Sequence, residues 1–129
     1  MFTPKSAFSG FSVNDLAKAR AFYGETLGLQ VDDEGVGMRL HLPGGGTVFA
    51  YPKEDHQPAT FSMLDFVVAS IDEAVDELTN RGVQFEHYDG SPNTDEKGIF
   101  RGTSKNQGPD IAWFKDPAGN VLAVLEEVA

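Results

Sequence analysis

The sequence predicts an α+β protein that consists of two βαβββ modules. Three segments of the first half recur in the same order in the second half. The matched pairs are Phe11–Tyr23 with Phe66–Leu78, Gly28–Val31 with Gly82–Phe85, and Gly46–Ala50 with Gly119–Ala123. One such match could arise by chance, but three in the same order indicate a duplicated unit.

The first module is expected to span residues 1–52. Ser9 to Val13 alternates between polar and apolar residues, which predicts a strand, and Asn14-Asp15 can cap the helix that follows. Residues 16–27 keep apolar positions at helical spacing, and Gly28 stands where a helix ends. Three short strands are then predicted, at 29–32, 37–42 and 47–51.

The second module is expected to span residues 62–129, after a linker at 53–61. It repeats the order of the first, with a strand at 64–68, a capping box at Ser70–Glu73 that opens a helix to about Arg81, and strands at 83–88, 111–114 and 121–125. A polar insertion, Asp89 to Asp110, separates two of these strands. A loop of this length is usually a lid or disordered, and Ile99 and Phe100 favour a lid because they have apolar surface to bury.

Length, composition and charge exclude several classes of protein. The 129 residues fit one domain, residues 1–129, with 20 acidic and 10 basic residues and a formal net charge of −10, which disfavours nucleic acid as a partner. Because the chain has no cysteine, disulfides and thiolate chemistry are excluded. No signal peptide or membrane-spanning segment is recognisable, so we expect a cytoplasmic protein.

Several segments carry a family resemblance: Phe11–Leu16, Phe22–Leu29 and Ala112–Asn120. Together with the two-module order, they resemble the vicinal oxygen chelate superfamily, which includes glyoxalase I, bleomycin-resistance proteins and extradiol dioxygenases. The resemblance implies a glyoxalase-like fold, in which the sheets of the two modules curl into an incomplete barrel around a cavity for a small molecule. It also implies a homodimer, and the linker permits pairing of modules within one chain or between two. Members of the superfamily differ in chemistry, so the fold does not fix the reaction.

The resemblance also places a metal site. In the metal-dependent members, four strand positions in the cavity supply His, Gln or Glu ligands, and these positions correspond here to Phe8, Ala50, Met63 and Ala123. A phenyl ring and a methyl group have no lone pair to donate, and a thioether is a poor ligand for such ions. We therefore expect no metal and no cofactor.

Polar candidates remain near the implied cavity. Counting by twos from Met63 places Asp65 on the cavity face, an arrangement that suits a general base; the alternative is that Asp65 bonds Ser12 or a backbone amide and does no more. His56, in the linker, could act as a base or donor, or be simply solvated. His41 shares a face with Arg39, so the two could reach one ligand, or His41 could be a partly solvated strand residue.

We therefore expect a metal-free protein that binds a small apolar or aromatic molecule, of the resistance or sequestration type. Trp113 is expected to line the cavity, because its neighbour Phe114 then faces the helices. The expected ligand-binding residues are Phe8, Ser12, His41, Ala50, Met63, Trp113 and Ala123, and the expected catalytic residues, if the protein is an enzyme, are Asp65 and His56. The alternatives are a glyoxalase-like lyase or isomerase, or a dioxygenase-type enzyme, with a divalent metal not located from the sequence; a metal-free acid/base catalyst; and an interaction module with a filled cavity.

Overall fold

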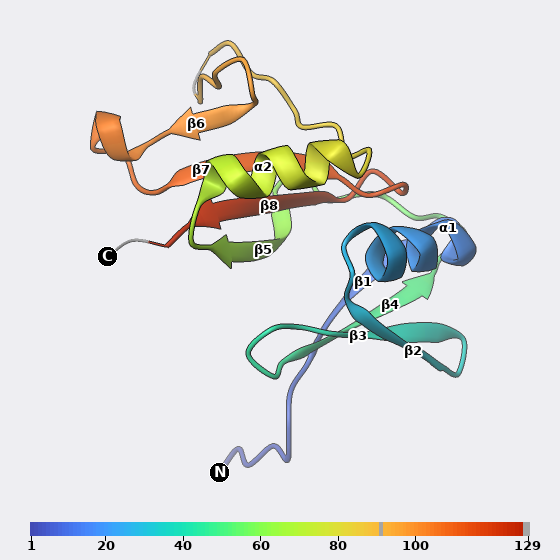
Figure 1. Cartoon of the computed structure of the whole chain (residues 1–129). Coiled ribbons are helices and arrows are strands. Elements are labelled where there is room, and N and C mark those ends of the chain that lie inside the picture. Colours follow the sequence, from blue (N-terminus) through green and yellow to red (C-terminus); the bar gives the residue numbers. More distant parts are fainter. Residues whose placement is uncertain (91, 128–129) are drawn as a thin grey trace. The chain divides into compact units, whose positions relative to one another are not determined.

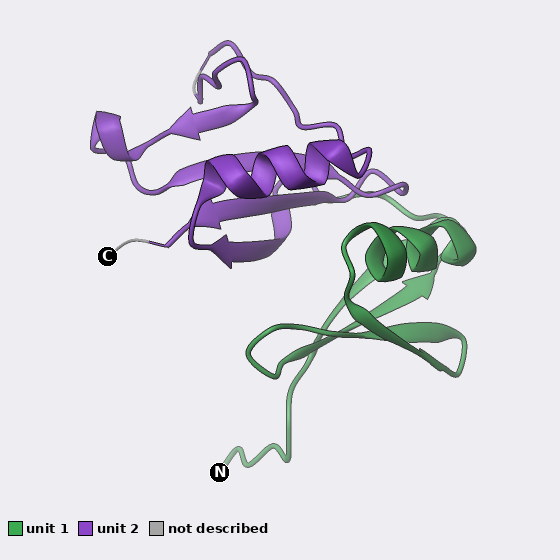
Figure 2. Ribbon diagram, in the orientation of Figure 1, with its two compact units in different colours: residues 1–58 green, residues 59–129 purple. Residues whose placement is uncertain are grey.

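A computed structural model describes residues 1–90 and 92–127 of the chain (Figure 1). The chain divides into two compact units, residues 1–58 and residues 59–129, and the boundary falls within the linker that the sequence indicates (Figure 2). Each unit contains one four-stranded sheet with the order of a βαβββ module. The prediction of an α+β chain with two such modules is confirmed.

The first unit contains β1 (Ser9–Val13), α1 (Leu16–Arg20), a π-helical segment (Ala21–Thr26), β2 (Gln30–Glu34), β3 (Gly37–His41) and β4 (Thr47–Pro52). Its strands lie in the order β1-β4-β3-β2, with β1 and β4 parallel and the other pairs antiparallel. We call this sheet the first sheet.

The helix of the first unit begins where its sequence predicts, but its last turns depart from α-helical geometry. The carboxylate of Asp15 caps the start by accepting a hydrogen bond from the Lys18 amide at 3.1 Å. The end widens into π geometry, in which the Leu27 amide donates to the Phe22 carbonyl at 2.9 Å. Tyr23, in this segment, is fully buried and its ring lies 5.6 Å from the ring of Phe11.

This packing defines two faces of the first sheet. In the strand register, Phe11 and Met38 both pair with Ala50, so all three side chains lie on the side of the sheet that carries the helix. The residues that alternate with them lie on the opposite side. We call the side of each sheet opposite to its helix the open face.

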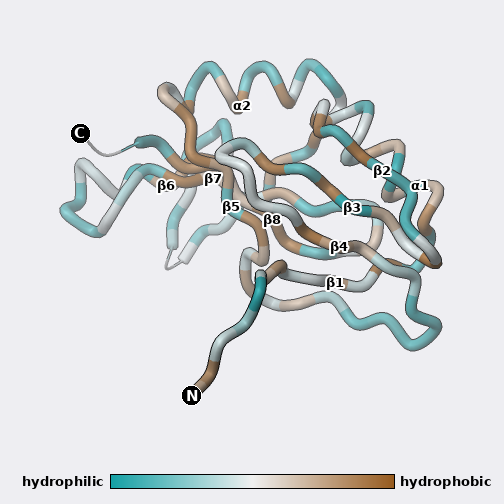
Figure 3. The backbone as a smooth tube through the Cα atoms, turned by 90° about the horizontal axis from the view of Figure 1, so that it is seen from below, coloured by the Kyte–Doolittle hydropathy of each residue, from teal (hydrophilic) through white to brown (hydrophobic). Residues whose placement is uncertain are grey.

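The second unit contains β5 (Ser62–Val68), α2 (Ile71–Asn80), β6 (Ile99–Arg101), a short 3₁₀ turn (Thr103–Lys105), β7 (Asp110–Lys115) and β8 (Val121–Glu126). The strand order is β5-β8-β7-β6, with β5 and β8 parallel, and we call it the second sheet. Apolar residues follow one another along β7 and β8, whereas α2 alternates between apolar and polar residues (Figure 3). This pattern fits central strands and an amphipathic helix that covers one face.

The helix α2 is capped by residues from two elements. The Ser70 hydroxyl accepts a hydrogen bond from the Glu73 amide at 3.3 Å, as the capping box predicts, and Glu126 at the end of β8 accepts one from the Ile71 amide at 3.0 Å. Its buried residues, Ile71 and Val75, lie on the side of the second sheet where Phe114 and Leu122 are also fully buried. This side holds the core of the second unit.

The edge of the second sheet differs from the prediction. Residues 83–88 do not form a strand: only Phe85 bridges to Phe114, and the Glu86 amide donates to the Trp113 carbonyl at 2.8 Å. The regular edge strand is β6, which lies inside the predicted insertion; Ser91 of that insertion is outside the described residues. Two short segments thus share the outer edge of β7, because the chain leaves that edge after Glu86 and returns to it at Ile99.

Candidate functional site

The open face of the second sheet presents a carboxylate and an indole with a small residue between them. Asp65 of β5 pairs with Ala123 of β8, and Ala123 pairs with Trp113 of β7, so the three side chains stand in one row on the same face. We call them the Asp65–Trp113 row. Its members are residues that the sequence indicated for a common cavity wall.

The rest of this face is mainly apolar. The paired strand residues that share it are Ser62, Val67, Phe100, Ile111, Lys115, Val121 and Leu125. Asp65 is the only acidic member among them, and it is exposed. Its carboxylate makes no hydrogen bond or ion pair with the described residues of the second unit, 59–90 and 92–127.

Trp113 belongs to an aromatic cluster. Its ring centroid lies 5.7 Å from that of Tyr88 in an edge-to-face arrangement and 6.5 Å from that of Phe100. The ammonium of Lys105 stands 5.2 Å from the centroid of the Phe100 ring. Tyr88 directly precedes the insertion and Phe100 lies within it, in β6, so two segments supply the aromatic contacts that hold the indole in place.

The open face of the first sheet centres on Arg39 of β3. Its guanidinium donates two hydrogen bonds to Glu34, at 2.6 and 2.7 Å, and one to the Thr47 hydroxyl at 3.1 Å. It also lies 4.8 Å from the ring centroid of Phe8 and 5.6 Å from that of Phe49. The hydrogen bond from Arg39 lowers the pKa of Glu34 and raises that of Arg39, so both groups are charged at neutral pH.

Two histidines of the first unit have hydrogen-bond partners. The Ser12 hydroxyl and Nδ1 of His56 are 2.6 Å apart, and both residues are half-buried. His41, at the end of β3, places Nε2 2.7 Å from a carboxylate oxygen of Asp32. The sequence did not indicate the Ser12–His56 contact, because Ser12 lies in β1 and His56 lies in the linker after β4, far apart along the chain.

The four positions where the family resemblance places metal ligands are occupied by apolar side chains. Phe8 is 60% exposed and covers Arg39, and Met63 is the extra residue of a β-bulge, because Ser62 and Leu64 pair with consecutive residues of β8. Ala123 lies on the open face in the Asp65–Trp113 row.

Ala50 differs from the expectation. It is fully buried on the helix side of the first sheet, so it does not line the open face, and its neighbour Phe49 takes that place. The position on β4 that faces the open side is therefore Phe49 instead of Ala50, because a shift of one residue along a strand moves a side chain to the opposite face. A phenyl ring provides no metal ligand either.

Within residues 1–90 and 92–127, no group of three or more acidic or histidine side chains is arranged to hold a metal ion.

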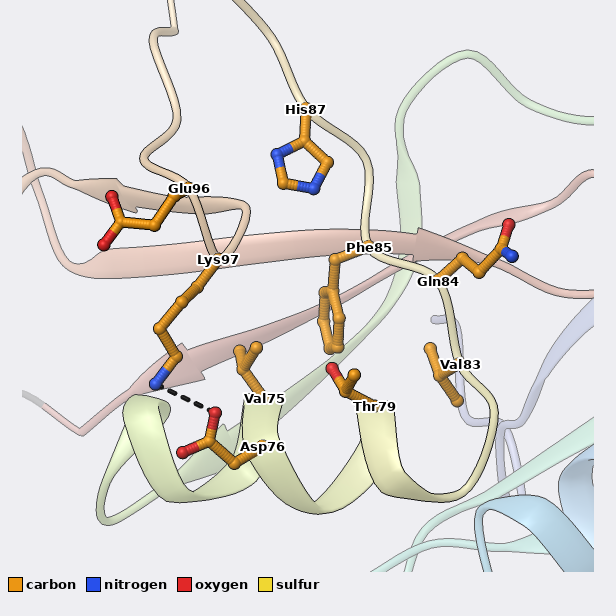
Figure 4. A pocket seen from close by; sticks show the side chains of 9 residues that line it. All are labelled: Val75, Asp76, Thr79, Val83, Gln84, Phe85, His87, Glu96 and Lys97. Carbon is orange, nitrogen blue, oxygen red and sulfur yellow. Dashed lines mark ion pairs between the residues drawn. The ribbon is translucent and has the colours of Figure 1, made fainter.

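A groove of about 520 Å³ lies on the helix side of the second unit, between α2 and the segments that follow it (Figure 4). Its floor includes Val75, Val83 and Phe85, and His87 stands at its rim. The ammonium of Lys97 is held there by Asp76 at 3.0 Å. The sequence did not indicate this groove, because its walls depend on the path of the insertion.

Comparisons with known proteins place the fold. No curated sequence is significantly similar to this chain, and no helix in the described residues is long and apolar enough to cross a membrane. Among the solved structures that match nearly the whole chain is TnmS3, an antibiotic-binding protein from Streptomyces sp. CB03234, with 23% identity, a TM-score of 0.66, and coverage of 98% of this chain and 100% of that one. The fosfomycin resistance protein FosX from Listeria monocytogenes has 15% identity, a TM-score of 0.68, and coverage of 98% of this chain and 96% of that one. Lactoylglutathione lyase from Agrobacterium tumefaciens has 22% identity, a TM-score of 0.61, and coverage of 95% of this chain and 94% of that one.

These structures share the fold and differ in what their names describe, namely binding, resistance and lyase activity. The sequence match is more specific for the family. The model of the Glyoxalase/Bleomycin resistance protein/Dioxygenase superfamily matches residues 8–124, and this chain belongs to that superfamily.

Proposed function

We propose that this protein binds a small apolar or aromatic molecule without a metal ion, as a resistance- or sequestration-type member of its superfamily. The observation that carries the proposal is the Asp65–Trp113 row. There, an alanine stands at a position where metal-dependent members hold a ligand, and an aromatic cluster adjoins it. Ala123 is fully buried, and the half-buried indole of Trp113 beside it provides a surface on which a flat molecule can stack.

The donor chemistry supports a metal-free site. At the family's ligand positions the chain has Phe8, Met63, Ala123 and, on the open face of β4, Phe49. The imidazole of His56 is engaged with Ser12, and that of His41 with Asp32. Binding by these faces therefore relies on apolar and aromatic contact rather than on coordination.

The similar structures support the same class of function. TnmS3 is named as an antibiotic-binding protein and FosX as a fosfomycin resistance protein, and both match this chain over nearly its whole length. At 23% and 15% identity they share its fold. Their names favour small-molecule binding as the role to test first.

The single tryptophan makes the test direct, because Trp113 is the only indole in the chain and lies in the proposed site. Planar aromatic compounds are titrated into the protein while Trp113 fluorescence is recorded, with N-acetyltryptophanamide as the control for optical quenching. We expect saturable quenching by members of the panel, confirmed by calorimetry. A panel that leaves both the fluorescence and the calorimetric baseline unchanged would contradict the proposal.

A second candidate is a metal-free acid/base catalyst that uses His56. The observation that favours it is the 2.6 Å contact between the Ser12 hydroxyl and Nδ1 of His56, because such a contact orients an imidazole for proton transfer. Carbonyl compounds that bind are incubated in D₂O, and proton exchange at the carbon next to the carbonyl is followed by NMR. The candidate requires exchange that is lost in His56→Asn and reduced in Ser12→Ala; exchange no faster than in buffer would exclude it.

A further inference from the structure

We propose that the first unit has its own binding surface for a single aromatic ring, at Gly10 on the open face of the first sheet. This surface belongs to a different unit from the Asp65–Trp113 row, so it goes beyond the proposed function. Three features of the first sheet carry it: bare backbone at Gly10, two near-parallel rings on the neighbouring strand, and a polar contact at one end.

Gly10 leaves a gap among the side chains of the open face. It pairs with Phe49 of β4, and the alternation that puts Phe11 on the helix side puts Gly10 on the open face. Apart from the adjoining residues, a Cβ atom placed on Gly10 has two neighbours within 4 Å in the described part of the chain. These are the Phe49 carbonyl oxygen at 3.5 Å and a ring carbon of Tyr51 at 4.0 Å, both ordinary contact distances. Gly10 is exposed, so a ligand can reach this backbone. We call the position the Gly10 gap.

Two aromatic residues of β4 stand beside the Gly10 gap. The rings of Phe49 and Tyr51 have centroids 6.2 Å apart and planes 19° from parallel, and both residues are half-buried. The ring of Phe49 lies against the bare backbone of Gly37, where a Cβ atom would be only 2.8 Å from a ring carbon. The guanidinium of Arg39 is also 5.6 Å from the centroid of the Phe49 ring. The rings are therefore held by packing before a ligand arrives, and a ring on Gly10 meets the ring of Tyr51.

The dimensions of the Gly10 gap suit one ring, and one end of it is polar. Ser12, the next residue of β1 on this face, is about 7 Å away along the strand, and β4 lies about 4.8 Å away across the sheet. These intervals fit one six-membered ring. The Ser12 hydroxyl is 2.6 Å from Nδ1 of His56, so a hydroxyl group on the ring can face a polar pair. Phenol is therefore the probe of choice.

Phenol and cyclohexanol separate aromatic contact from general hydrophobic contact, because each is a six-membered ring with one hydroxyl group. Both are titrated into the isotope-labelled whole chain while the backbone amide signals of Gly10 and Ser12 are followed by NMR. Phenol should shift both signals saturably and bind about 5-fold more tightly than cyclohexanol, as an aromatic contact provides. Equal affinities, or a Gly10 signal that phenol does not move, would overturn the inference. The indole signal of Trp113 reports on the second unit in the same spectra, so shifts there alone would leave the proposed function intact.

Gly10→Val tests the location, because its side chain fills the gap. A Cβ atom meets no close contact there and a β-branched residue suits a strand, so the unfolding midpoint should not fall. The phenol-induced shift at Ser12 should be lost. Gly10→Ala, a milder change, should weaken phenol binding to a smaller extent. The matched control is Gly46→Val, because Gly46 also has space for a side chain but lies in the turn before β4. It should bind phenol as wild type does. Normal binding by Gly10→Val, or equal loss in Gly46→Val, contradicts a site at Gly10.

Discussion

Arg101 of β6 and Asp72 of α2 form a two-pronged hydrogen bond, with nitrogen–oxygen distances of 2.8 and 3.0 Å. Arg101 also donates to Asp95 at 3.1 Å, and the Lys97 ammonium lies 3.1 Å from Asp72. These contacts join the insertion to α2. The hydrogen bonds from Arg101 and Lys97 hold the pKa of Asp72 well below its usual range, and the hydrogen bonds that Arg101 donates to Asp72 and Asp95 raise the pKa of Arg101.

Arg101→Gln should therefore destabilise the second unit. The variant leaves the carboxylates of Asp72 and Asp95 close together without the guanidinium. Because the pair is partly exposed, solvent screens it, and we expect the free energy of unfolding at pH 7 to fall by about 1 kcal/mol. Arg81→Gln is the control. Arg81 is the C-cap residue of α2 and forms an exposed ion pair with Glu77 of the same helix, so its loss should lower the free energy of unfolding by only about 0.3–0.5 kcal/mol. Equal losses in urea unfolding would show that the network adds nothing to a simple surface pair.

The effect of Arg101→Gln should depend on pH. A carboxyl group whose pKa is lowered by folding, such as Asp72, stabilises the folded state above its unfolded pKa and loses this contribution as the pH falls toward its folded value. The stability difference between wild type and Arg101→Gln should thus be constant near neutrality and shrink below about pH 4. A difference that grows in acid would contradict the assignment of Arg101 as the partner of Asp72.

The turn between β7 and β8 should be sensitive to Asp116. Its buried carboxylate accepts hydrogen bonds from the amides of Ala118 and Asn120 and from the Asn120 side chain, each at 2.9 Å. Asp116→Ala removes these acceptors and should lower the free energy of unfolding by about 2–3 kcal/mol.

A swap of the pair provides the control for that prediction. In Asp116→Asn/Asn120→Asp, an amide oxygen still faces the two backbone amides, and the side-chain hydrogen bond is retained with donor and acceptor exchanged. The double variant should be more stable than Asp116→Ala in thermal unfolding. If it is equally unstable, the charge at position 116, rather than the hydrogen bonds, is what the turn requires.

Met63→Arg should block ligand binding and leave the fold intact. Met63 is a half-buried residue at the bulge of β5, two residues before Asp65, and an arginine there adds bulk and positive charge beside the proposed site. Saturable quenching of Trp113 should be lost while the unfolding midpoint stays close to that of wild type. Val36→Arg is the control, because Val36 is 77% exposed at the turn between β2 and β3. Normal binding by Met63→Arg would place the ligand elsewhere.

The repeated module could be predicted from the sequence because its signals are local. The capping residues Asp15 and Ser70 accept the hydrogen bonds that their positions predict. The prediction of a strand at 83–88 was wrong for a physical reason. Val83 and Phe85 alternate with polar residues as in a strand, and both are buried. The chain nevertheless leaves the edge of the sheet after Glu86, and β6 completes that edge. Nothing in the periodicity of the segment indicates where the insertion returns.

The face of a strand residue was harder to predict than the strand itself. The matched segments around Ala50 and Ala123 align in sequence, yet Ala50 lies on the helix side of its sheet and Ala123 on the open face. A shift of one residue between repeats is invisible in composition and exchanges the two faces. The aromatic cluster of Trp113 could not be foreseen either, since Tyr88 lies beyond the point where the chain leaves the sheet edge and Phe100 returns to that edge only with the insertion.

Metal content tests the central claim, a metal-free binding site, most directly. The protein is purified without a histidine tag or chelating resin and analysed by plasma emission spectrometry. Because Phe8, Phe49 and Ala123 offer no ligand atoms, we predict that no divalent metal accompanies the chain in stoichiometric amount. Zinc, nickel, iron, manganese or cobalt equimolar with the chain would contradict the account and favour a glyoxalase- or dioxygenase-type enzyme.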